Sequence, residues 1–260
     1  PEGTTRLYSI GRKLGTGPHQ LEVLQSLRRA DSLVVSLGNL ADENRDAERD
    51  EACGRRLAPL GLTAVVPRSD DLARGRDTLV AWATAHGVPF VAANLVGADG
   101  EPVFPRFVLR EVGGLQVAII GVVGPENAEG LPGRVAAGWR VTTPRVAVDE
   151  VVKVLQDRLG RRPDLTVVLA GTLDSDDVAT VSQGDDVVIG GKTYGDTTSR
   201  SAQVTTPPGA RDKARHVRAM MQVRGTWLGP TEIEAEYAPG PSLTTLRSLT
   251  HPLAGPLGRD

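Results

Sequence analysis

The chain has 260 residues, of which 40% are hydrophobic and 24% are charged. This length and apolar content exclude a disordered or fibrous chain, and they suffice for one large domain or two small ones with a buried core. The 30 Lys and Arg and the 32 Asp and Glu leave a net charge of -2. A chain without a basic excess has no general attraction to nucleic acid or to an anionic membrane surface.

Apolar runs and cysteine content exclude further classes. The longest apolar runs, such as Val117–Val123, are far shorter than the ~20 residues that a membrane helix needs, so no membrane span is predicted. Cys53 is the single cysteine, which excludes a disulfide within the chain and a zinc site built from cysteines.

Short β-branched runs alternate with segments of helical period, a pattern typical of α/β proteins. Strands are predicted at Arg6–Ile10, Ser32–Leu37, Leu62–Val66, Pro89–Ala93, Phe104–Glu111, Leu115–Val122, Leu165–Ala170, Val187–Gly190, His216–Val223 and Glu232–Tyr237. Helices are predicted at His19–Arg29, Asp42–Leu57, Asp70–His86, Pro144–Leu159 and Ser175–Ser182. The short Gly-containing turn at 112–114 predicts an antiparallel hairpin, and therefore a mixed sheet.

The last stretch, residues 239–260, is predicted to be an extended Pro-rich tail outside a domain of residues 1–238. Its leucines recur every three or four residues, so a short helix over Ser242–Leu249 is the most regular structure expected there. So short an apolar helix is unstable alone, and the tail is expected to pack on another subunit or on its own domain. The Pro and Gly content equally permits the alternative of a disordered linker to another domain.

Six segments follow in a particular order along the chain. They are SLVVSLGN at Ser32–Asn39, GLTAVVPRSDDL at Gly61–Leu72, PFVAANL at Pro89–Leu95, REVGGLQVAIIGVVGP at Arg110–Pro125, DLTVVLAGTLDSDD at Asp164–Asp177 and DDVVIGGKTYG at Asp185–Gly195. Together they resemble the N-terminal, calcineurin-like metallophosphoesterase domain of the 5'-nucleotidase family. The resemblance implies a four-layer αββα sandwich of two mixed β-sheets, with the active site at the carboxyl ends of the strands. Enzymes of that family hold two divalent cations with Asp, His and Asn side chains.

The positions that match the family's metal ligands carry poorly suited residues. The neutral amide of Asn39 stands where a bridging carboxylate belongs, and it cannot hold two dications together. The resemblance therefore implies a vestigial site with no metal, no other cofactor and no catalytic residue. Its members are Gly11, Lys13, Asn39, Arg68, Ser69, Asp70, Asp71, Gly171, Lys192 and Tyr194.

The histidine content agrees with that interpretation. The chain has four histidines, and none ends an early or middle strand, where metal ligands would converge. Each is predicted to be a surface or capping imidazole. They are His19, His86, His216 and His251.

Two interpretations of the remaining charges stay open. Arg68 and Lys192 provide fixed cations that would bind an anion in place of the metals. Alternatively, they pair with Asp70 or Asp71 and close the site as a satisfied ionic cluster.

These patterns predict a catalytically inactive metallophosphoesterase-fold protein that acts as a structural or accessory subunit of a larger complex. Family resemblance places it in the periplasm or outside the cell, and family analogy includes a cytochrome or another electron-transfer subunit among its candidate partners. Two alternatives remain. One is a metal-dependent phosphoesterase or 5'-nucleotidase with an all-carboxylate site at Asp70, Asp71, Asp174 and Asp176. The other is a phosphate- or nucleotide-binding module that uses Arg68 and Lys192.

Overall fold

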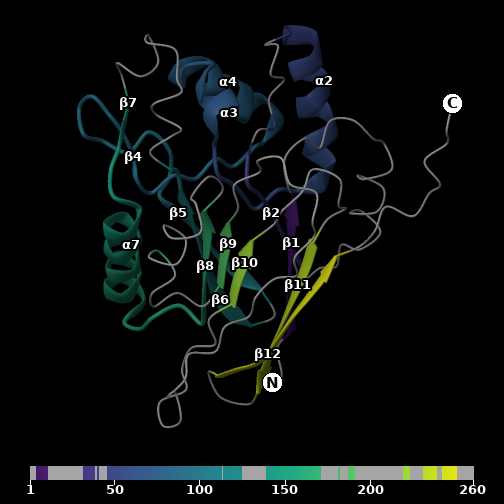
Figure 1. The fold of residues 1–260 in the computed structure, drawn as a ribbon, viewed down its shortest axis with the longest axis vertical. Helices are drawn as coiled ribbons and strands as arrows, with labels where there is room; N and C mark the ends of the chain where they lie inside the picture. The colour runs from purple at the N-terminus through teal and green to yellow at the C-terminus, as the bar shows by residue number, and fades with distance from the viewer. Residues whose placement is uncertain are drawn as a thin grey trace, which may run out of the picture.

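Two mixed β-sheets form the centre of the computed structural model (Figure 1). The structure describes residues 4–10, 32–38, 40, 46–112, 114–124, 139–170, 181, 187–190, 219–222, 231–238 and 242–250. The first sheet has five strands in the order β12-β11-β1-β2-β3, and the second has five in the order β10-β9-β8-β6-β5. A separate ribbon pairs β4 (Leu95–Gly97) with β7 (Trp139–Val141).

The central strands of the second sheet are apolar and largely buried. β6 (Leu115–Val122) and β8 (Leu165–Ala170) pair in parallel, and β9 (Val187–Gly190) and β10 (Ala219–Gln222) continue the parallel part. β5 (Phe107–Val112) closes the other edge antiparallel to β6. Buried parallel strands require apolar residues at successive positions, and β8 has six buried residues in a row.

Helix α7 (Pro144–Leu159) covers the outer face of the second sheet. It begins with Pro144, whose missing N–H costs nothing in the first turn, and ends before Gly160 in the left-handed conformation. Its Val148, Val151 and Leu155 pack against alternate residues of β6 and β8. In Figure 1, α7 accordingly lies beside this sheet, away from the first one.

The first sheet combines strands from both ends of the chain. β1 (Thr4–Ile10) pairs in parallel with β2 (Ser32–Ser36), and β2 pairs in parallel with β3 (Ala64–Val65). β11 (Thr231–Ala238) is antiparallel to β1, and β12 (Ser242–Thr250) is antiparallel to β11.

The helices beside the first sheet supply apolar side chains to the core that also fills the space between the sheets. They are α2 (Ala47–Leu57), the 3₁₀ turn η1 (Ala58–Leu60), α3 (Ser69–Leu72) and α4 (Arg76–His86). Leu57, Leu60 and Leu79 belong to this cluster together with Val34 and Val167.

The segment at 89–94 passes from one sheet to the other at their carboxyl ends. The Val91 N–H donates to Val65 O at 2.8 Å, and the Ala93 N–H donates to Gly121 O at 2.7 Å. Gly121 lies where a Cβ atom would overlap the Val91 carbonyl oxygen, so only glycine permits this approach. The carboxyl ends of β3 and β6 therefore meet at one end of the molecule.

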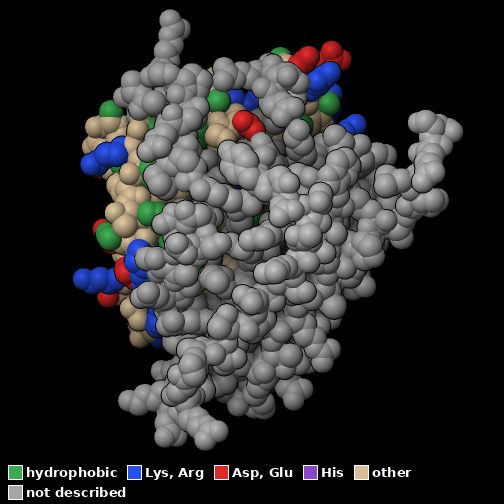
Figure 2. All heavy atoms as spheres, viewed as in Figure 1, with side chains coloured by type: hydrophobic (Ala, Val, Ile, Leu, Met, Phe, Trp, Pro, Cys, Tyr) green, Lys and Arg blue, Asp and Glu red, His purple; other side chains and the backbone are tan. Residues whose placement is uncertain are grey.

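Charged side chains of both signs are mixed on the surface that Figure 2 shows. Acidic and basic groups lie together over α7 and near the outer end of α2. Arg145 and Asp149 of α7 form an ion pair, and Arg106 reaches Glu150 of the same helix at 2.6 Å. This face therefore presents no single-sign patch among its coloured residues. Within the part of the chain that the structure describes, no helix is both long and apolar enough to cross a bilayer.

The predicted four-layer αββα sandwich of two mixed sheets is confirmed, as is the β5–β6 hairpin. Three local predictions are wrong. The single helix expected at Asp70–His86 is divided into α3 and α4, because Gly75 adopts φ 83° between them. Pro89–Ala93 forms an isolated bridge with the first sheet rather than a strand, since its backbone turns toward the second sheet. Ser242–Leu249 is part of strand β12 rather than a helix.

The remaining predictions concern the domain division and helices that lie partly or wholly outside the described residues. The division expected after residue 238 falls between β11 and β12, two paired strands of one sheet. The helix predicted at His19–Arg29 lies outside the described residues, as do residues 42–45 of the next predicted helix and all of Ser175–Ser182 except Val181.

Candidate functional site at the strand ends

Four of the ten predicted vestigial-site residues lie in the described part of the chain, and all four follow β3. Arg68 and Asp71 are buried there, and Ser69 and Asp70 are half-buried. The other six predicted residues lie outside the described residues: Gly11, Lys13, Asn39, Gly171, Lys192 and Tyr194. The described site therefore consists of the turn after β2 and the turn after β3.

Gly38 brings these two turns into contact. It has φ 81°, a conformation that L side chains rarely adopt. A Cβ atom at Gly38 would also overlap the Val66 carbonyl oxygen and would lie 2.9 Å from Cγ of Arg68. The turn after β2 thus requires glycine for both its conformation and its packing.

The Asp71 carboxylate connects the two turns by hydrogen bonds. Its Oδ1 accepts from the Leu40 N–H at 3.1 Å, and its Oδ2 accepts from the Arg68 N–H at 3.0 Å. The side chain is fully buried, with 0% relative exposure. Main-chain N–H donors to a carboxylate are strong hydrogen bonds, and they compensate the cost of burying this group.

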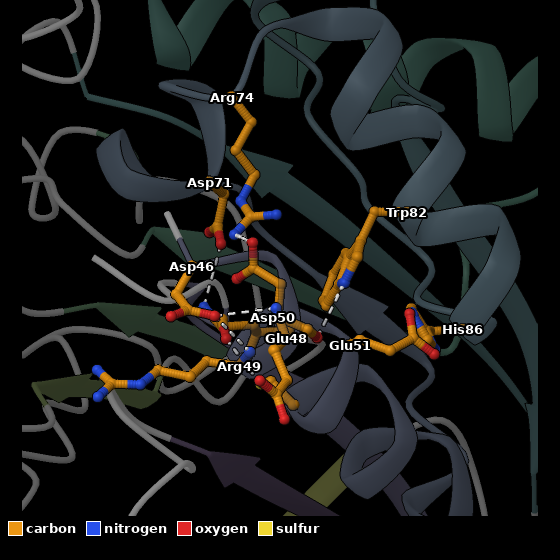
Figure 3. Close-up of polar contacts among 11 residues, drawn as sticks. Asp46, Glu48, Arg49, Asp50, Glu51, Asp71, Arg74, Trp82 and His86 are labelled. Carbon is orange, nitrogen blue, oxygen red and sulfur yellow. Dashed lines mark hydrogen bonds and ion pairs between the residues drawn. The ribbon is translucent and has the colours of Figure 1, made fainter. Parts of the chain in front are cut away.

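A second set of polar contacts joins α2 to residues that follow the same turns (Figure 3). Asp50 of α2 forms an ion pair with Arg74, and their side chains are 10% and 6% exposed. The Arg74 guanidinium lies 5.7 Å from the centre of the Trp82 ring, and the Trp82 indole N–H donates to Asp50 O at 3.2 Å. These contacts join α2, α4 and the turn between α3 and α4.

Cys53 contacts the turn after β2 from the side of α2. Its thiol donates to Leu40 O at 2.8 Å, so Leu40 is held through its carbonyl by Cys53 and through its amide by Asp71. Burial raises the pKa of the Cys53 thiol to about 11, and the nearby Asp71 and Asp50 charges add to this increase. Cys53 is therefore a neutral hydrogen-bond donor at neutral pH.

The described donors do not fit a pair of divalent cations. Asp71 is enclosed and bound to main-chain amides, Ser69 offers only a neutral hydroxyl, and among the described residues of this turn Asp70 adds one half-buried carboxylate. Within the described residues, no three His, Cys, Asp or Glu side chains lie where they could hold one metal ion together.

Arg68, one of the two residues predicted to bind an anion, is 8% exposed. Its Cγ packs beside Gly38, and its backbone N–H donates to Asp71. The hydrogen bond from Arg68 to Asp71 is thus made by its backbone rather than by the guanidinium on which both interpretations of the site depend. Lys192, the other residue predicted to bind an anion, lies outside the described residues.

Asn94 is a further polar residue at the strand ends, and its role is not evident from its sequence segment. It is fully buried, and its amide group donates to Val123 O at 2.8 Å and to Thr142 O at 3.0 Å. Its Oδ1 accepts from the Val123 N–H at 2.9 Å. One side chain therefore joins the end of β6 to the segment that follows β7. An amide between apolar residues in PFVAANL is the only signal for this in the sequence.

The structure corrects the prediction that His86 is a surface or capping imidazole. Its side chain is 8% exposed, its Nε2 lies 3.1 Å from Glu51 Oε2, and its ring centre is 5.4 Å from that of Trp82. The ring packs where a Cβ atom of Gly54 would otherwise lie, so glycine in α2 makes room for it. His86 thus docks α4 on α2. The other three histidines lie outside the described residues.

Solved structures that superpose on this fold include a phosphoesterase, a nucleotidase precursor and a thiohydrolase. The calcineurin-like phosphoesterase YfkN from Bacillus subtilis superposes with a TM-score of 0.73 at 15% identity, covering 98% of this chain and 92% of that chain. A 5'-nucleotidase precursor from Thermus thermophilus superposes with a TM-score of 0.73 at 17% identity, covering 95% of this chain and 54% of that chain. The sulfate thiohydrolase SoxB from the same organism superposes with a TM-score of 0.72 at 17% identity, covering 90% of this chain and 42% of that chain.

These comparisons define the fold. The chain has a metallophosphoesterase fold of the 5'-nucleotidase type. It spans about half the length of the nucleotidase and SoxB chains. No protein-family model and no curated protein matches the sequence.

Proposed function

We propose that this chain is a catalytically inactive metallophosphoesterase-fold protein that serves as a structural or accessory subunit of a larger, extracytoplasmic complex. The observation that carries the proposal is that a buried carboxylate at the strand ends binds the protein's own backbone amides. Asp71 is enclosed and accepts main-chain hydrogen bonds from Leu40 and Arg68, in the part of the fold where a phosphoesterase exposes groups to metal and substrate.

The sequence supports the same proposal at the undescribed positions. Asn39 offers an amide where a bridging carboxylate is needed, and Gly171 and Lys192 offer no imidazole. Catalytic groups that act as a unit lose activity together, so losses at several positions leave little residual turnover. The partner is another protein of the assembly, and the family analogy includes an electron-transfer subunit among the candidates.

Metal content and turnover test the inactive state together. We expect the purified chain to hold less than one equivalent of metal and to hydrolyse neither p-nitrophenyl phosphate nor AMP in added Mn²⁺ or Zn²⁺. A 5'-nucleotidase assayed alongside provides the positive control. Metal-dependent turnover that disappears in the Asp70→Asn variant would contradict the proposal and favour the phosphoesterase alternative.

Native purification tests the accessory role. We expect the untagged protein to elute in an assembly larger than its own 27.5 kDa. Elution as a free monomer from gently lysed cells would contradict that role. Stabilisation by nucleotides or phosphate would instead favour the binding module, since a ligand at 100 times its Kd adds about 2.7 kcal/mol to the free energy of unfolding.

A further inference from the structure

We infer that Asp71 is a positioning residue that fixes the turn after β2 against the turn after β3, so that this end of the first sheet keeps its shape without a metal ion. The inference deepens the proposed function and rests on it, because a metal-holding site would stabilise these turns by ligation.

The first step of the argument is the geometry of the hydrogen bonds. The two Asp71 oxygens accept from two different turns, Leu40 on one and Arg68 on the other. A single carboxylate therefore restrains both backbones at once. A divalent ion between two strand-end loops restrains them in the same way, through ligands from each loop.

The second step is that other contacts converge on the same turn. Gly38 lies against Val66 and Arg68 with no room for a side chain, and the Gly38 N–H donates to Ser36 Oγ at 3.2 Å. The Cys53 thiol holds Leu40 O from the side of α2. The turn after β2 is thus already restrained at Gly38 and at the Leu40 carbonyl, and the hydrogen bond to Asp71 restrains the Leu40 amide as well.

The third step is the burial of Asp71. With 0% exposure, the side chain has no access to a ligand from solvent, and its hydrogen bonds do not compete with water. The carboxylate of Asp71 therefore interacts with backbone amides inside the protein. The same burial separates Asp71 from Asp70, its half-buried neighbour, which provides a matched comparison.

Amide hydrogen exchange on the intact, metal-depleted chain tests the inference. We expect the Leu40 and Arg68 amides to exchange as slowly as that of Val66, whose N–H donates to Ser36 O at 3.0 Å within the sheet. Addition of EDTA or Mn²⁺ should leave all three rates unchanged. Exchange of Leu40 and Arg68 at the rates of unprotected amides would overturn the inference, and this measurement needs no variant.

The Asp71→Asn variant adds a second readout. An Asn side chain keeps one acceptor oxygen but turns an NH₂ group toward the other amide, so one of the two N–H groups loses its partner. We expect exchange of Leu40 or Arg68 to become about tenfold to a hundredfold faster, with Ile119 and Ile120 of β6 unaffected. The Asp70→Asn control should leave Leu40 and Arg68 unchanged.

The outcomes separate this inference from the proposed function. If Mn²⁺ slows exchange at Leu40 and Arg68 and EDTA reverses the effect, both fail, because the site holds metal. If neither metal nor the Asp71→Asn change alters exchange, the inference fails and the proposed inactive state stands.

Discussion

Two carboxylates at opposite ends of the strands bind main-chain amides in different surroundings. Asp71, at the carboxyl end of the first sheet, is fully buried and accepts from Leu40 and Arg68. Asp164, at the amino end of the second sheet, accepts from the Gln116 N–H at 2.8 Å and from Arg161, which is 54% exposed, at 2.5 Å.

The comparison indicates where the fold depends on polar groups. Contacts at the carboxyl end are enclosed, so a lost hydrogen bond there leaves a buried group unsatisfied. At the amino end water can replace a lost partner, and the cost is smaller. Among the described residues, the contacts of Asp71 are therefore expected to contribute more to stability than those of Asp164. Four tests, ordered by expected effect, sharpen that contrast.

The largest effect is expected from Gly38→Ala. The new Cβ would overlap Val66 O, and the φ of 81° is unfavourable for alanine, so we expect a loss of about 4 kcal/mol in the free energy of unfolding. Urea unfolding measures it. Gly75→Ala is the matched control, because Gly75 has φ 83° with nothing within 4 Å of a Cβ atom. The ψ of 156° at Gly75 is itself unfavourable for a side chain, so this variant should cost about 2 kcal/mol, without the added overlap. Equal losses in the two variants would contradict the close approach of the two turns.

Asn94→Ala should cost about 3 kcal/mol, because it leaves the Val123 N–H and the Val123 and Thr142 carbonyl oxygens without their buried partner. Thermal and urea unfolding both report this loss. Thr84→Ala, which removes a hydroxyl bonded to Val80 O on the exposed face of α4, should change stability by about 0.5 kcal/mol or less. A loss below about 1 kcal/mol for Asn94→Ala would mean that water replaces these bonds.

Asp164→Asn should cost about 1 kcal/mol at pH 7. Burial acts to raise the pKa of Asp164, but the hydrogen bonds from Arg161 and from the Gln116 amide outweigh it and lower the pKa below 3.8. The hydrogen bonds of Asp164 therefore stabilise the fold above pH 3.8, and this stabilisation is lost as the pH falls through the lowered pKa. Urea unfolding should show a smaller difference between the variant and the wild type at pH 3 than at pH 7. Asp157→Asn on the exposed side of α7 is the control, and it should change stability at pH 7 by about 0.5 kcal/mol or less.

The smallest effect on stability is expected at Cys53. Because its pKa is about 11 in the folded protein, against an ordinary 9.0, its contribution is complete below pH 9 and is lost as the pH rises toward 11. Two pKa units mean about a hundredfold less thiolate at pH 8. Native Cys53 should therefore react with iodoacetamide at least about a hundredfold more slowly than the unfolded chain. Equal rates would show that the thiol is open to solvent.

Much of the fold is readable in the sequence where one pattern dominates. β6, β8 and α7 have the predicted bounds, because their apolar runs are long and Pro144 marks a helix start. The break between α3 and α4 depends on the conformation of Gly75, and a single glycine in a helical pattern does not reveal it. The sequence does not reveal β12, because its leucine spacing fits a helix, whereas its pairing with β11 is a tertiary contact.

The candidate site is predictable in composition but not in geometry. The sequence identifies Arg68, Ser69, Asp70 and Asp71 as neighbours after a strand. It does not reveal that Asp71 reaches the amide of Leu40, 31 residues earlier, because that contact depends on how two turns pack. The role of Asn94 depends on Val123 and Thr142 in the same way.

The pairing of β1 with β11 has a consequence for the order of folding. Thr4 lies opposite Glu236, 232 positions later (236 minus 4), whereas β5, β6 and β8 lie within residues 107–170. Contacts between distant positions close a long loop and form late. During synthesis, β5, β6 and β8 can pair with one another before β11 exists. Until then, one edge of β1 has no partner strand. Because β11 must be synthesised before that edge is covered, the unpaired edge of β1 is open to aggregation for longer than the strands of the hairpin.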